Sequence, residues 1–247
     1  MQKKISKIAF IDSGFGGLLL ASHIHKSFPE LEIFYFGDVK NMPYGEKDAG
    51  FLNERYKIFQ QKAKEYNVDL LVVACNTLSA TSFQTEEKLV ETIDIISISI
   101  DYINQKNKKE NIESLALVAT PNTINSKIYQ KNLNEKIRVQ EFPAKNLASL
   151  IENETLEKVN KEFIEIIGDF NGKILLGCTH YSVLASSRLN MISQDVILDK
   201  YLQENFYLGK DEEKSVQLFV NAELEKYRNF AKKLFPKENF EISLLNF

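Results

Sequence analysis

Short apolar runs recur along the whole chain, and most of them are separated by stretches with helical periodicity. Several runs are apolar at every position, which is typical of strands covered on both faces. The stretches between them, such as 48–66 and 156–167, carry apolar residues three and four positions apart, as amphipathic helices do. The pattern predicts an α/β fold with mainly parallel sheets. The predicted strands are Ile8–Ile11, Ile33–Phe36, Leu70–Ala74, Ile95–Ile98, Leu115–Ala119, Ile137–Val139, Ile174–Leu176, Val196–Leu198 and Val216–Val220.

The chain also shows weak internal similarity, which indicates two related halves. The segments around Cys75 and Cys178 both read as a strand, a small residue, a cysteine, a polar pair and the start of an apolar helix. We therefore expect two similar α/β domains, with a break near Ser99–Asp101 and a C-terminal segment that returns to the first half. The predicted boundaries are residues 1–99 for the first domain, completed by 203–247, and residues 100–202 for the second.

Composition narrows the class of protein. The 247 residues are 44% hydrophobic and 26% charged, as in ordinary soluble globular proteins. The net charge of −3, without a basic stripe, argues against a nucleic-acid partner. No apolar run approaches the roughly 20 residues that span a bilayer, and the N-terminus lacks a signal-peptide pattern, so we expect a cytoplasmic protein without membrane contact. The sequence leaves a monomer and a homodimer both open. Lys106–Lys109 is expected to form a solvated loop.

The chain has only two cysteines, and each follows one of the apolar runs. In the cytoplasm both are expected to be free thiols. A zinc site is not expected, because the chain has three histidines and no paired-ligand spacing. Two of the histidines, His23 and His25, fall on a predicted helix and are interpreted as surface residues.

A parallel strand that ends in a cysteine delivers its thiol to the carboxyl edge of the sheet, where open α/β sheets bind ligands. Two such thiols can face one substrate from opposite sides, which suits moving a proton off one face of a carbon and onto the other. A cysteine can act as a base when nearby donors bring its pKa toward neutrality. The alternative for each cysteine is a small buried hydrophobe, which explains two matched contexts less well.

Polar and glycine-rich turns follow other predicted strands. The loop Asp12–Gly17 can present backbone N–H groups to an anion at a helix N-terminus, although it lacks the third glycine of a dinucleotide fingerprint. A tight turn in which Asp12 caps the helix is the alternative. Asp38 and Met42–Gly45 follow the second predicted strand. This turn either brings Tyr44 and the Gly45 amide to the sheet edge or lies on the surface.

Small polar side chains flank both thiols. Asn76 and Thr77 follow the first cysteine, and Thr179 follows the second. His180 lies two residues after Cys178, a spacing that favours a functional histidine over a structural one.

In combination these motifs resemble the glutamate racemase family, within the cofactor-independent aspartate/glutamate racemase group. The resemblance covers residues 5–200 and implies two α/β domains related by a pseudo-twofold axis, with the active site between them and without pyridoxal phosphate or metal. The matching stretches are Asp12–Gly14 with Gly16–Gly17, Gly37–Asp38 with Pro43–Gly45, Ala74–Thr77, Ala119–Thr120 with Thr123 and Ser126, and Gly177–Tyr181.

The resemblance also implies roles for individual residues. Cys75 and Cys178 would be the acid/base pair on opposite faces of the substrate α-carbon. Asp12 would be the partner of Cys75, and His180 the partner of Cys178. Glu152 matches a family glutamate near the histidine. The carboxylates and the ammonium group of the substrate would be held by Asp12, Ser13, Pro43, Tyr44, Gly45, Asn76, Thr77, Thr123, Thr179 and His180.

Two segments depart from the family pattern. Ser182 stands where the family usually has proline, and residues 93–102 lack the usual Gly-Val-Ile-Glu-Pro pattern, which bears on the hinge and the side-chain pocket. The resemblance still implies an enzyme that interconverts L- and D-glutamate and supplies D-glutamate for peptidoglycan. The alternatives are an aspartate racemase, another racemase of the same group, or a non-catalytic amino-acid-binding protein.

Overall fold

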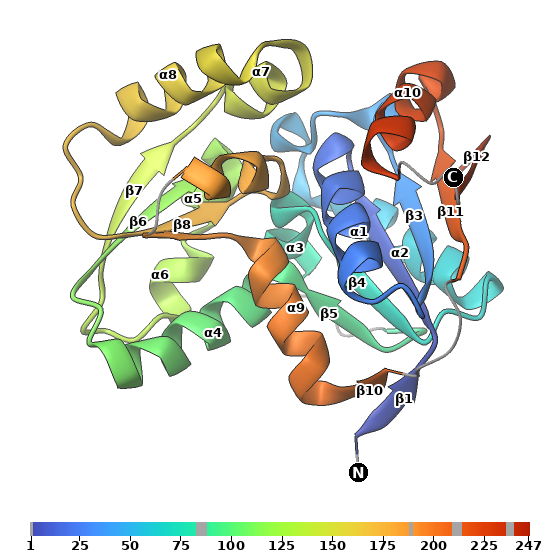
Figure 1. Cartoon of the computed structure of the whole chain (residues 1–247), viewed down its shortest axis with the longest axis horizontal. Helices are drawn as coiled ribbons and strands as arrows, with labels where there is room; N and C mark the ends of the chain where they lie inside the picture. The colour runs from blue at the N-terminus through green and yellow to red at the C-terminus, as the bar shows by residue number, and fades with distance from the viewer. Residues whose placement is uncertain (1, 83–87, 188–189, 209–213, 236–239) are drawn as a thin grey trace.

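The structure is a computed structural model in which residues 2–82, 88–187, 190–208, 214–235 and 240–247 are described. Most of its strands form two parallel sheets, and the helices pack around these sheets. Figure 1 shows the two sheets side by side. The predicted α/β class with mainly parallel sheets is confirmed.

The larger sheet has six strands and combines the N-terminal part of the chain with its C-terminal part. All of its strand pairs are parallel, and β11 from the C-terminal part pairs with β3. In sheet order its strands are β12 (Phe240–Leu244), β11 (Val216–Val220), β3 (Glu32–Gly37), β2 (Lys7–Asp12), β4 (Leu70–Val73) and β5 (Thr92–Asp94).

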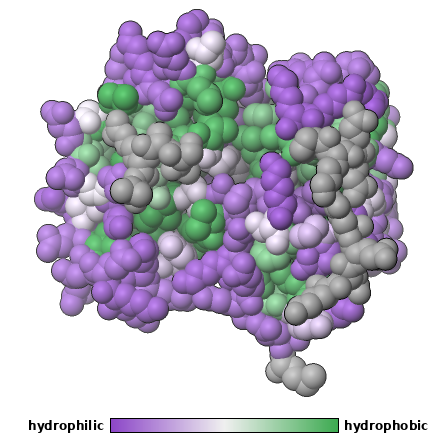
Figure 2. All heavy atoms as spheres, in the orientation of Figure 1, coloured by the Kyte–Doolittle hydropathy of each residue, from purple (hydrophilic) through white to green (hydrophobic). Residues whose placement is uncertain are grey.

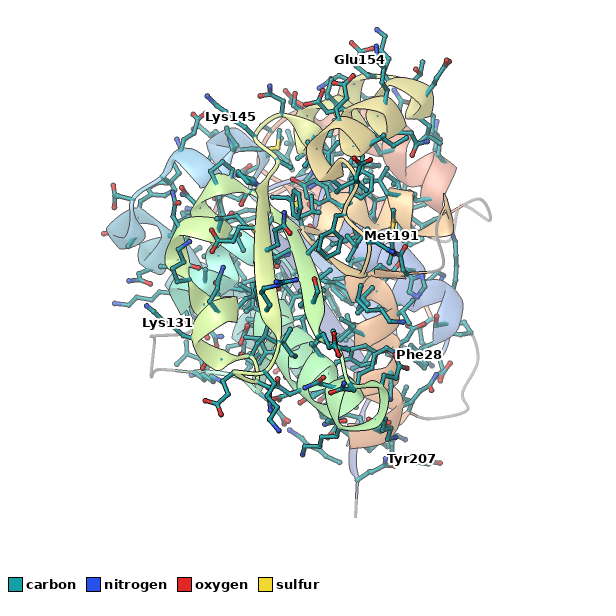
Figure 3. The ribbon with its side chains drawn as sticks, turned by 90° about the vertical axis from the view of Figure 1, so that its left-hand side faces the viewer. Phe28, Lys131, Lys145, Glu154, Met191 and Tyr207 are labelled. Atoms are coloured by element: carbon teal, nitrogen blue, oxygen red, sulfur yellow. The ribbon has the colours of Figure 1, made fainter. Side chains whose placement is uncertain are left out.

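The smaller sheet has four parallel strands from the middle of the chain. In Figure 3, where Lys145 is labelled just beyond β7 and Glu154 just beyond α7, these strands face the viewer. A separate parallel pair joins β1 (Lys3–Ile5) to β10 (Phe206–Leu208). In sheet order the four strands are β7 (Arg138–Pro143), β6 (Ser114–Ala119), β8 (Lys173–Gly177) and β9 (Met191–Ile192).

Helices cover both faces of the sheets and connect most of the strands. The α-helices are α1 (Phe15–Ser27), α2 (Ala49–Glu65), α3 (Asn76–Ser82), α4 (Ile95–Glu110), α5 (Pro121–Ser126), α6 (Ile128–Asn132), α7 (Leu147–Asn153), α8 (Leu156–Ile167), α9 (Gln194–Asn205) and α10 (Leu224–Leu234). The 3-10 helices are η1 (Val39–Asn41), η2 (Tyr44–Glu46) and η3 (Thr179–Ser187).

The continuously apolar strands are buried on both faces, as predicted. In β4, Leu70 and Val72 point into the core cluster that includes α1, whereas Leu71 and Val73 point into the cluster that includes α2. Side chains on successive strand residues face opposite sides of a sheet, so a strand between two helical layers must be apolar throughout. Figure 2 shows hydrophilic residues around the rim of one face and hydrophobic residues nearer to its middle.

Two predicted strands are helices. Ile95–Ile98 forms the first turn of α4, and Val196–Leu198 lies in the first turns of α9. In α4 the side chain of Asp94 accepts a hydrogen bond of 2.9 Å from the N–H of Ser97, which is an N-cap that ends the preceding strand and starts the helix. The predicted break near Ser99–Asp101 falls within α4.

Two further expectations from the sequence were wrong. Lys106–Lys109 belongs to the last turns of α4 rather than to a loop, where its positive charge complements the helix dipole. His25 is buried, with its ring 5.7 Å from that of Phe235, because the C-terminal segment returns to pack on α1. Among the described residues, no helix is both long and apolar enough to cross a membrane.

Candidate active site

One cavity of about 250 Å³ lies where the carboxyl ends of strands from both sheets meet. The residues after β2, β4, β6 and β8 all contribute to its wall, so both halves of the chain are needed to form it. The cavity is lined by Asp12, Ser13, Met42, Pro43, Tyr44, Gly45, Cys75, Asn76, Thr77, Thr120, Ala148, Ser149, Glu152, Asn153, Cys178, Thr179, His180 and Lys226.

Cys75 lies between the end of β4 and the start of α3 and is 7% exposed. Its sulfur is 4.0 Å from Ser13 Oγ, and it accepts hydrogen bonds from the backbone N–H groups of Thr77 and Leu78 in the first turn of α3. Burial raises the pKa of the Cys75 thiol, and the negative charge of Asp12 raises it further, while the two N–H groups act in the opposite direction. Cys75 is therefore a neutral thiol at neutral pH.

Cys178 occupies the matching position between β8 and η3. Its Sγ is 3.7 Å from His180 Nδ1, and the other ring nitrogen of His180 lies 2.9 Å from Glu152 Oε1. Burial opposes a charge on His180, but its hydrogen bonds with Cys178 and Glu152 outweigh that effect and raise the pKa of His180 to about 10. At neutral pH a positively charged imidazolium thus stands beside the second thiol.

Glu152 connects His180 to the C-terminal part of the chain. It lies on α7 with a side chain only 4% exposed, and its Oε2 is 3.4 Å from Nζ of Lys226 on α10. Burial acts to raise the pKa of Glu152, but the hydrogen bond and charge of His180 and the charge of Lys226 together lower it. The carboxylate is therefore ionised at neutral pH, and it holds the imidazolium in place through its hydrogen bond with His180 Nε2.

Asp12 bridges the two halves at the end of β2. Its Oδ1 accepts hydrogen bonds from Gly14 N (3.1 Å) and Ser13 Oγ (3.3 Å), and its Oδ2 accepts one from Thr179 Oγ1 (3.1 Å). Burial raises the pKa of Asp12, although the charge on His180 and the hydrogen bonds from the Gly14 N–H, the Thr179 hydroxyl and the Ser13 N–H oppose the rise. Ser13 lies between Asp12 and Cys75, so among the described contacts the carboxylate reaches the first thiol through that hydroxyl.

Gly16 allows the two halves to approach closely at this point. A Cβ at Gly16 would lie 2.8 Å from the backbone nitrogen of His180 and would collide with Thr179 Oγ1. Only a residue without a side chain lets the start of α1 sit against η3 at this distance. The glycine-rich loop therefore has a packing role between the halves, in addition to bringing Ser13 to the cavity.

Tyr44 is held at the cavity wall by a buried charge network. Its hydroxyl donates a hydrogen bond of 2.5 Å to Asp38 Oδ2, which also accepts a bond of 2.6 Å from Arg55 Nε. Asp38 and Tyr44 are almost completely buried, and Arg55 is 7% exposed. The turn after β3 is therefore anchored from within and does not lie free on the surface.

The cavity brings together almost all of the residues that the sequence predicted. Thr123 differs, because it is fully buried and lies behind Thr120, with 3.1 Å between the two hydroxyl oxygens. Thr120 lines the cavity instead and follows β6 directly, so its position after a strand was the available signal. Met42 adjoins the Pro43–Gly45 motif, but no local motif indicated the remaining lining residues, which are Ala148, Ser149, Asn153 and Lys226. Among the described residues, no group of three or more His, Cys, Asp or Glu side chains is arranged to hold a metal ion.

Known proteins share both the sequence and the fold. A glutamate racemase from Clostridium botulinum is 30% identical over an alignment of 257 positions, which covers 95% of this chain and 98% of that protein. A glutamate racemase isoform from Bacillus anthracis has the same fold, with a TM-score of 0.82, 24% identity and coverage of 98% of this chain and 97% of its own. A glutamate racemase from Francisella tularensis, solved in complex with D-glutamate, gives a TM-score of 0.78 at 24% identity and the same coverage. No family model matches the chain.

Two parallel sheets that share one cavity at their carboxyl edges, together with these relatives, define an amino-acid racemase built from two similar α/β domains. More narrowly, the chain belongs to the glutamate racemase family.

Proposed function

We propose that this protein interconverts L- and D-glutamate by proton transfer between two thiols, Cys75 and Cys178, on opposite faces of the substrate α-carbon. The observation that carries this proposal is the pair of cysteines at matched strand ends of the two sheets, both lining one cavity. The D-glutamate formed would serve peptidoglycan synthesis in the cytoplasm. Neither a cofactor nor a metal is required, because the two thiols provide both the base and the acid.

The two thiols have different surroundings, with Ser13 and Asp12 near Cys75 and His180 beside Cys178. A thiolate at Cys178 would form an ion pair with the imidazolium of His180, 3.7 Å away. Cys75 is buried near the carboxylate of Asp12, which favours its neutral form. A two-base reaction requires a base on one side of the α-carbon and an acid on the other, and the two thiols would fill these roles. After one turnover the protonation states are reversed and must be reset.

Removing a proton from the α-carbon of an amino acid is difficult without a cofactor, because the carbanion needs stabilisation by groups around the carboxylate. The cavity offers the hydroxyl of Thr77 and the carboxamide N–H of Asn76 as donors, and it is also lined by the hydroxyls of Ser13 and Thr179, which donate to Asp12. Burial of these donors strengthens their interaction with developing negative charge.

Glutamate is the substrate favoured by family membership, and the relative from Francisella tularensis was solved with D-glutamate. Aspartate is one methylene shorter, so its distal carboxylate would miss the same donors while the α-carbon stays between the thiols. A buried donor left unpaired lowers kcat/KM, and we expect glutamate to exceed aspartate by at least roughly a hundredfold.

The test is to incubate the purified protein with L-glutamate and, separately, L-aspartate, and to quantify both enantiomers by chiral chromatography. The variants Cys75→Ser and Cys178→Ser should each lose racemisation by several orders of magnitude, because a hydroxyl is a far weaker acid than a thiol. Binding of D-glutamate and the thermal unfolding temperature show whether each variant is folded.

Other results would contradict the proposal in distinct ways. Binding of glutamate without any racemisation by the parent protein would indicate an amino-acid-binding protein. A preference for aspartate would indicate an aspartate racemase with a rebuilt pocket. Parental activity in Cys178→Ser would show that the second thiol is structural.

A further inference from the structure

The side chain of Asn76 is held by a residue from the other half of the chain. Gln194, the first residue of α9, is 2% exposed and forms a reciprocal amide pair with Asn76. Asn76 Nδ2 donates to Gln194 Oε1 at 2.7 Å, and Gln194 Nε2 donates to Asn76 Oδ1 at 2.9 Å. No sequence motif marks Gln194, and its side chain does not line the cavity.

A directional chain of hydrogen bonds sets the orientation of this pair. The hydroxyl of Ser99 donates its only proton to the backbone carbonyl of Ile95 at 2.6 Å, so its oxygen serves Gln194 as an acceptor. Gln194 Nε2 lies 3.4 Å from that oxygen. The amide group of Gln194 must therefore point its nitrogen toward Ser99, which fixes the position of its own carbonyl oxygen. That oxygen in turn selects the nitrogen of Asn76 as its donor.

Tyr129 completes the arrangement around Asn76. Its hydroxyl donates to Asn76 Oδ1 at 3.2 Å, and its oxygen lies 3.3 Å from Gln194 Nε2 and shares the second N–H of that group with Ser99. The oxygen of Asn76 thus receives two hydrogen bonds, which use both of its lone pairs. Within the part of the chain that is described, no residue accepts the second N–H of Asn76. The Asn76 carboxamide therefore presents only an N–H donor to the cavity.

We propose that Gln194 is a positioning residue that locks the Asn76 carboxamide with its free N–H available to an anionic substrate. This inference rests on the proposed function, in which Asn76 helps to hold a carboxylate of glutamate. It also gives a role to the altered segment 93–102, because that segment contains Ser99, the residue that orients Gln194. Without the amide pair to Gln194, the Asn76 carboxamide can rotate by half a turn and present its oxygen to the cavity. That oxygen would repel the carboxylate of the substrate.

The test is a double-mutant cycle on kcat/KM for glutamate, built from Asn76→Ala, Gln194→Met and the combination. Methionine keeps the length of glutamine but cannot form the amide pair. Each single variant should lower kcat/KM by about tenfold, the order expected when one hydrogen bond to a charged group is lost. In the Asn76→Ala background, Gln194→Met should add no further loss, because the group it positions is already absent.

The matched control is Gln203→Met, the same substitution at an exposed position of α9, which should keep the parental kcat/KM. A purely structural Gln194 would lower the unfolding temperature in both backgrounds and would not show this non-additivity in kcat/KM. Should Gln194→Met fail to fold, the cycle is run with Ser99→Ala, which removes only the orienting hydroxyl and should also lose its effect in the Asn76→Ala background.

Several results would overturn the inference. They are losses that multiply in the double variant, a parental kcat/KM in Gln194→Met, and a parental kcat/KM in Asn76→Ala. An inactive parent protein would instead refute the proposed function, and the inference with it. An active parent with multiplying losses would refute the inference alone.

Discussion

The ion pair between Glu152 and His180 allows a quantitative prediction for Glu152→Gln. The carboxylate lies 2.9 Å from His180 Nε2, and both side chains are less than 10% exposed. Glutamine has nearly the same shape, so the substitution removes the charge and leaves the packing in place. His180 then loses one of the two partners that keep it protonated, and its pKa should fall from about 10 toward its ordinary value.

The magnitude follows from the rise in the pKa of His180 from 6.5 to about 10, which corresponds to about 5 kcal/mol. Cys178 contributes to the same rise, so we assign roughly half of it, about 2–3 kcal/mol, to Glu152. A folded-state pKa above the unfolded value gives stability that is fully present below about pH 6.5 and is lost as the pH rises through about 10. Glu152 stays ionised at pH 6 because its own pKa is lowered.

Urea unfolding at pH 6, 8 and 10 measures this difference. Glu152→Gln should lower the free energy of unfolding by about 2–3 kcal/mol at pH 6 and by progressively less toward pH 10. The control is Glu154→Gln, which removes an exposed ion pair with Lys158 and should leave unfolding unchanged at all three pH values. A loss of stability that is the same at pH 6 and pH 10, or no loss at pH 6, would refute the assignment of a charged His180.

Two further predictions concern stability. The pKa of His23 is raised mainly by its hydrogen bond with Asp199, so His23 should stabilise the contact between α1 and α9 below about pH 6.5 and lose that effect as the pH rises. Because its side chain is one-third exposed, His23→Gln should lower the free energy of unfolding in urea by less than about 1 kcal/mol at pH 6 and not at all at pH 9. An equal loss at both pH values would contradict this account. Asp38→Asn leaves the guanidinium of Arg55 buried without its carboxylate and should lower the free energy of unfolding by about 3–5 kcal/mol, whereas an unfolding curve like that of the parent would show that this network contributes little.

The strands that carry the thiols could be predicted because burial on both faces of a sheet requires an apolar residue at every position of the strand. The two wrong strands, Ile95–Ile98 and Val196–Leu198, are also apolar, but each starts a helix. Asp94 caps the first of these helices through Ser97, and this local hydrogen bond outweighs the β-branched composition of the run. A short apolar run alone does not distinguish a buried strand from a buried helical turn.

The candidate site was predictable where its residues follow strands, because strand ends converge at one edge of a parallel sheet. Lys226 and Gln194 escaped prediction for a different reason. Each reaches the site from a helix, and nothing in the adjacent sequence marks it. Lys226 depends on α10 returning to the first sheet, and Gln194 depends on α9 crossing between the halves. Their roles arise from tertiary packing, which a local pattern does not encode.

The central claim is that two thiols act on opposite faces of one α-carbon. It is tested most directly by racemisation of L-glutamate in heavy water, stopped at low conversion, with mass spectrometry of the separated enantiomers. A two-base reaction gives D-glutamate that carries deuterium at the α-carbon, because the donated hydrogen comes from a thiol that has exchanged with solvent, while unreacted L-glutamate remains protonated. Substantial protium at the α-carbon of the product would show that one group removes and returns the same hydrogen, which would contradict the account.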